Sequence, residues 1–63
     1  MSIDALLEGF QEILEMEKRA KYFYDHYIEQ IDDEKIRSQL TEIRCDEIEH
    51  IQIAEKLIKC VKR

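Results

Sequence analysis

The sequence predicts an all-α protein, an antiparallel two-helix hairpin that pairs with a second copy of itself to make a four-helix bundle. The 63 residues include no Pro and a single Gly, and 40% of them are charged, a composition typical of long helices with solvated outer faces. Apolar residues recur every three or four positions in two stretches of similar length. Two helices alone cover little of each other's apolar surface, so we expect a homodimer.

The first helix is expected over about residues 3–31. Ser2 is a good N-cap and Asp4 places negative charge in the first turn, while only Gly9 opposes the helix within it. Residues spaced alternately by three and four positions form one stripe, as in the seam of a helical bundle. The stripe consists of Leu6, Phe10, Ile13, Glu17, Ala20, Tyr24, Tyr27 and Ile31.

A turn is expected at about residues 32–33, followed by a second helix over about 34–62, so that residues 1–63 form a single hairpin. The acidic run 32–34 interrupts the apolar pattern and supplies an N-cap. The second stripe consists of Leu40, Ile43, Glu47, His50, Ala54, Leu57 and Val61. A further apolar set cannot also face the partner hairpin and suggests a ring of dimers or a missing helix. This set is Leu7, Leu14, Ile48, Ile51 and Ile58.

Ionisable residues occupy the middle of both stripes, where an unpaired charge is costly. Glu17 and Glu47 each lie 15 residues from Asp32, about 22 Å from the tip of the hairpin, and His50 lies one turn beyond Glu47. A carboxylate and an imidazole suit iron, manganese or zinc better than calcium or magnesium. A two-fold dimer doubles the set to four carboxylates and two imidazoles, enough for two metal ions. The alternative is an interchain salt-bridge network without metal.

Two motifs carry a resemblance to a known family. Glu17 is followed by Tyr24 seven residues later, and residues 44–50 read Arg-Cys-Asp-Glu-Ile-Glu-His. Over about residues 10–60 the chain resembles the ferritin-like superfamily, and the two-helix encapsulated ferritins more than the four-helix rubrerythrins. The resemblance implies that Glu17, Glu47 and His50 ligate two irons per dimer, and that Asp46 supports a ligand imidazole. Tyr24 is either a core aromatic or a hydrogen-bonding partner of a ligand.

The resulting hypothesis is a di-iron protein with ferroxidase activity, which oxidises Fe(II) between two subunits for iron storage or detoxification. One alternative is a structural coiled-coil dimerisation module in which the polar layer sets the register. Another is a metal-binding or peroxide-scavenging protein without storage. For the first hypothesis, the resemblance implies an encapsulating shell protein as a further partner.

Charge and composition also limit the partners and the compartment. The net charge of −5 argues against binding to nucleic acid or to an anionic membrane. The N-terminus lacks the features of a signal peptide, so we expect a soluble cytoplasmic protein, inside a protein shell if the resemblance extends that far. Cys45 and Cys60 would lie about 22 Å apart on one helix, so we expect free thiols.

Overall fold

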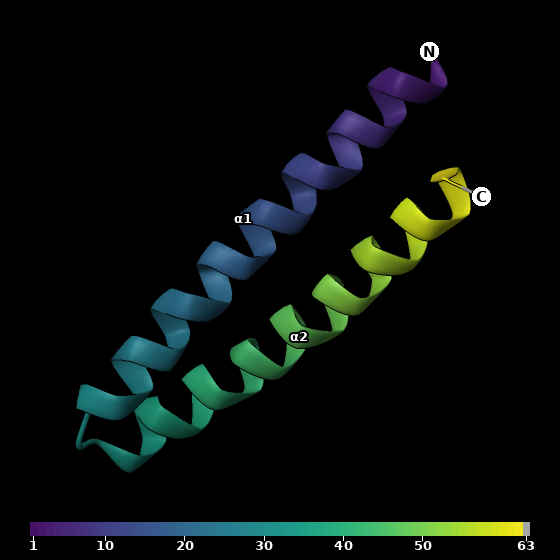
Figure 1. Cartoon of the computed structure of the whole chain (residues 1–63). Helices are drawn as coiled ribbons and strands as arrows, with labels where there is room; N and C mark the ends of the chain where they lie inside the picture. The colour runs from purple at the N-terminus through teal and green to yellow at the C-terminus, as the bar shows by residue number, and fades with distance from the viewer. Residues whose placement is uncertain (63) are drawn as a thin grey trace.

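The computed structural model describes residues 1–62 and consists of two α-helices joined by a short turn (Figure 1). Helix α1 spans Ile3–Gln30 and helix α2 spans Glu34–Lys62. The helices run antiparallel, with both termini at the same end of a rod that measures 47 × 15 × 14 Å. The predicted all-α hairpin is confirmed, and α1 ends one residue before the expected position.

Local side-chain contacts define where each helix begins. The Ser2 hydroxyl accepts a hydrogen bond from the backbone N–H of Ala5 at 3.1 Å, and this caps α1. The Asp33 carboxylate accepts hydrogen bonds from the N–H groups of Lys35 at 2.9 Å and Ile36 at 3.1 Å, which caps α2 in the same way. The Asp33 cap lets α2 begin after only three intervening residues, so the connection between the helices is short and restricts their register.

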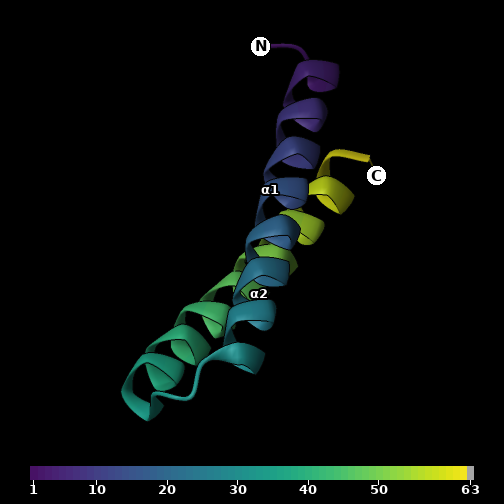
Figure 2. The same cartoon turned by 90° about the vertical axis from the view of Figure 1, so that its left-hand side faces the viewer.

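The faces that the helices turn toward each other follow a heptad pattern. Half-buried residues occupy positions 7, 10, 14, 17, 21, 24, 28 and 31 of the first half, and 40, 44, 47, 51, 58 and 61 of the second. Ala54 completes the second series and is the one buried residue in the described part of the chain. The helices stay side by side along the rod in both views (Figures 1 and 2). The hairpin therefore has a narrow apolar core, one contact face wide.

The structure corrects the expected division of the apolar residues. The set assigned to contacts beyond a dimer, which includes Leu14 and Ile51, is half-buried between α1 and α2. Part of the predicted stripe, including Ile13 and Leu57, is instead 40–46% exposed. Both stripes satisfy three-and-four spacing and lie beside each other on the helix, so spacing alone does not decide which one faces the neighbouring helix. These residues therefore no longer argue for contacts beyond a dimer, and a ring of dimers or a missing helix stays a prediction.

Exposed apolar side chains form a second stripe on each helix, and we call the two stripes together the uncovered face. Ile13 of α1 lines the same cavity of about 280 Å³ as Ile53 and Leu57 of α2, so both stripes lie on one side of the hairpin. The uncovered face comprises Ile13, Met16, Phe23, Tyr27, Ile36, Ile43, Ile53 and Leu57. Exposed apolar residues gathered on one side of a molecule often mark a site of association.

The structure also bears on the expectations about membrane spans and about the two cysteines. Neither helix, as far as residues 1–62 extend, has a stretch long and apolar enough to cross a membrane. Cys45 and Cys60 are exposed free thiols.

Candidate metal centre

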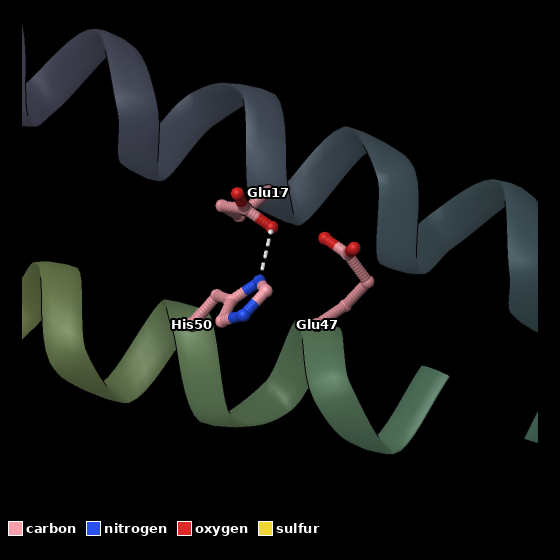
Figure 3. Close-up of side chains that lie close together, drawn as sticks. All are labelled: Glu17, Glu47 and His50. Atoms are coloured by element: carbon pink, nitrogen blue, oxygen red, sulfur yellow. Dashed lines mark ion pairs between the residues drawn. The ribbon is translucent and has the colours of Figure 1, made fainter. Parts of the chain in front are cut away.

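Glu17, Glu47 and His50 converge in the space between the two helices (Figure 3). Glu17 extends from α1, and the other two side chains extend from α2 toward it. One ligand atom from each residue lies within 4.8 Å of the others, and His50 Nδ1 is 3.5 Å from Glu17 Oε2. We call these three residues the triad.

The helical periodicity accounts for this convergence. Glu17 and Glu47 occupy heptad positions on the facing sides of α1 and α2. His50 follows Glu47 by one turn and lies at the border with the uncovered face, with 53% of its side chain exposed. The midpoint of α1 lies between Met16 and Glu17, and that of α2 lies between Glu47 and His50. The triad is therefore at the centre of the rod.

The Glu17 carboxyl group makes ionisation of Glu47 unfavourable. Hydrogen bonding with Glu17 raises the pKa of Glu47 above its usual value of 4.5, and burial and repulsion by Glu17 raise it further. Only the charge of His50 acts in the opposite direction. The buried Oε2 atom of Glu47 has no hydrogen-bond partner among the described residues. The hairpin thus holds a carboxylate that lacks a compensating cation.

The donor set suits a divalent transition-metal ion. Carboxylate and imidazole ligands bind such ions at about 2.0–2.2 Å, so the ligand atoms of one ion are at most about 4.4 Å apart. The observed spacing of up to 4.8 Å is slightly above that limit. Two carboxylates offset the charge of one divalent ion, and the orphaned Glu47 oxygen would gain a partner. The three ligands fall short of the four that even a tetrahedral site requires, so one chain provides an incomplete site.

The two predicted supporting residues, Asp46 and Tyr24, form no hydrogen bond with the triad among the described residues. Asp46 is exposed on α2, and its charge contributes to the raised pKa of Glu47. Tyr24 is half-buried and lines a separate hollow with Ala20 and Tyr27. Their supporting roles remain predictions.

Asp25 forms an ion-pair network with Lys21 and Arg44 that was not predicted from the sequence. Asp25 accepts a hydrogen bond from Lys21 Nζ at 2.7 Å and another from Arg44 Nη1, across the helix interface, at 3.2 Å. The hydrogen bond from Lys21 and the contacts with Arg44 hold the pKa of Asp25 below its usual value of 3.8. The Lys21–Asp25 spacing of four residues was a visible signal. The Arg44 contact depends on the register of the two helices, which the sequence does not specify to one residue.

Protein-family models, curated proteins and solved structures provide no match to this chain. The ferritin-like resemblance therefore rests on the residues themselves.

Proposed function

We propose that the chain binds ferrous ions between two copies of itself and oxidises them, as a di-iron carboxylate protein with ferroxidase activity. The observation that carries the proposal is the position of the triad. An incomplete set of metal ligands lies at the centre of the rod, at the border of an apolar face that the hairpin leaves uncovered. A second copy placed on that face would complete the set.

The central position of the triad favours a two-fold dimer. A two-fold axis through the triad and perpendicular to the rod would superpose the full length of both hairpins, with their turns at opposite ends. The same arrangement would cover the uncovered face and bring the exposed His50 into the interface. It would provide a glutamate from each of two helices and a Glu-x-x-His pair from each of the other two, the ligand set of di-iron carboxylate bundles.

The ligand charges fit two divalent ions. Two copies of Glu17 and Glu47 supply four negative charges, which offset two ferrous ions and relieve the repulsion between the carboxyl groups. As metal ligands, the two His50 imidazoles would be neutral and would add nitrogen donors without adding charge. Ferrous ions are the substrate in this proposal. Two of them lose one electron each, and these electrons with two protons reduce dioxygen to hydrogen peroxide, or hydrogen peroxide to water.

The experiment compares Glu47→Gln with Glu49→Gln. Both variants lose one carboxylate from α2, but Glu49 is exposed and outside the triad. Ferrous iron is added to each protein without oxygen, oxygen is admitted, and the ferric absorbance is followed. We expect the unmodified protein and Glu49→Gln to oxidise about two irons per dimer faster than a protein-free control. Glu47→Gln should lose most of this rate.

A rate no higher than that of the protein-free control would contradict the proposal. Sedimentation with and without a chelator then separates the remaining functions. A dimer indifferent to both iron and chelator would identify a structural coiled-coil module. A dimer that tightens with metal but does not oxidise iron would identify a redox-silent metal-binding protein.

A further inference from the structure

The cations nearest the triad do not pair with its carboxylates. Lys21 follows Glu17 by four residues, and Arg44 precedes Glu47 by three. Both spacings place the cation beside the carboxylate on the same helix face, and a Glu followed by Lys four residues later is the favourable orientation. Ion pairs of Lys21 with Glu17 and of Arg44 with Glu47 would therefore be expected.

Both cations are instead bound by a single carboxylate outside the triad. Lys21 Nζ lies 2.7 Å from Asp25 Oδ2, and Arg44 Nη1 lies 3.2 Å from Asp25 Oδ1. Each oxygen of Asp25 therefore has its own cation. The raised pKa of Glu47 is consistent with this arrangement, because neither Lys21 nor Arg44 contributes to it.

We propose that Asp25 is a positioning residue that holds Lys21 and Arg44 away from Glu17 and Glu47, and so keeps both carboxylates free for a divalent metal ion. The inference rests on the proposed function only in requiring the triad to bind metal. Without Asp25, Lys21 and Arg44 would turn to the carboxylates four and three residues away on their own helices, Glu17 and Glu47. A metal ion would then have to displace two internal ion pairs before it could bind.

Two variants distinguish a positioning role of Asp25 from a structural one, because removal of both cations should reverse the loss of metal affinity caused by Asp25→Asn. Asp25→Asn should weaken Mn²⁺ binding about tenfold, because two ion pairs then compete with the metal. Adding Lys21→Gln and Arg44→Gln to Asp25→Asn should restore the affinity to within about twofold of that of the unmodified protein, since no competing cation remains. If Asp25 only stabilised the hairpin, these additional substitutions would restore nothing.

Electron paramagnetic resonance of free Mn²⁺ provides the dissociation constant, and thiols such as Cys45 are poor ligands for this ion. Glu29→Gln is the matched control, because it removes one exposed negative charge from α1, one turn beyond Asp25. We expect that control to change the affinity less than about twofold. Equal affinity of Asp25→Asn and the unmodified protein, or a triple variant as weak as the single one, would overturn the inference.

A second readout requires no metal. In Asp25→Asn, the nitrogen resonance of the Arg44 side chain should shift when Glu47→Gln is added, because Arg44 then pairs with Glu47. In the unmodified background the same addition should leave that resonance in place. An Arg44 resonance that does not shift on Glu47→Gln in either background would overturn the inference. Absence of Mn²⁺ binding by the unmodified protein would instead contradict the proposed function, and the Arg44 resonance would still decide where the cations go.

Discussion

Glu47 combines three features in the metal-free hairpin: partial burial, an oxygen atom without a hydrogen-bond partner, and a second carboxyl group beside it. Each of them disfavours the ionised form. A fold that served stability alone would replace such a residue with an apolar one or with a charge of opposite sign. This unfavourable environment for a carboxylate is typical of a binding site that is formed before its ligand arrives.

The pH dependence of stability tests this account. Because the pKa of Glu47 is higher in the folded chain than its usual value of 4.5, the free energy of unfolding falls as the pH rises through the interval between the two values. Glu47→Gln keeps an uncharged group of the same shape at this position. In the presence of a chelator we expect this variant to be more stable than the unmodified protein at pH 7.

The difference should disappear below about pH 4.5, where Glu47 is protonated in both the folded and the unfolded chain. Urea denaturation at both pH values measures it, with Glu49→Gln as the control for loss of a charge on α2. A Glu47→Gln variant that is less stable than the unmodified protein at pH 7 without metal would contradict the assigned environment of Glu47.

At the scale of the helix, each element carries one apolar stripe that is half-buried against the other helix and a second stripe that is exposed. One stripe of α2, which includes Ile51, is half-buried against α1, and the other, which includes Ile53, belongs to the uncovered face. The two residues have the same side chain and lie two positions apart, about 200° around the helix. They therefore provide a matched pair that separates folding of the hairpin from its association.

We expect Ile51→Ala and Ile53→Ala to affect different equilibria. Ile51→Ala should lower the free energy of unfolding by about 1–2 kcal/mol, less than for a fully buried isoleucine because Ile51 is only half-buried. Ile53 is 53% exposed, so its replacement should leave the hairpin helical and weaken association. Urea denaturation and sedimentation at several protein concentrations measure the two effects. Equal loss of stability and of association in both variants would show that the stripes are not separate.

At the scale of the whole molecule, the hairpin is a rod 47 Å long with its ligands at the centre and its apolar surface on one side. A rod in which Ala54 is the one buried residue among residues 1–62 has little core of its own. Association through the uncovered face would supply the missing burial, and metal binding would couple to that association. Stability, assembly and the metal centre would then depend on the same interface.

The proposed two-fold axis predicts where the turns lie in the dimer. A spin label at Asp32→Cys, in a chain that also carries Cys45→Ser and Cys60→Ser, marks the turn. Because the turn lies about fifteen helical residues, or about 22 Å, from the axis, we expect a distance of about 45 Å between the two labels. Pulsed electron–electron resonance measures it, with a label at the central and exposed Arg19 as a short-distance control. Two labels at Asp32 within about 20 Å would show parallel hairpins, whose turns lie together.

The sequence was sufficient to predict the two helices, their capping residues and the three residues that converge at the centre. Caps and periodicity act over a few residues, and equal distances of Glu17 and Glu47 from the turn place them at similar heights in any antiparallel hairpin. The ligand role of these residues and the pairing of two hairpins stay predictions. Only the tertiary structure decided which apolar stripe faces the other helix and that Asp25 binds Arg44 across the interface. Both depend on the rotation and register of one helix against the other, which two adjacent stripes of equal spacing leave open.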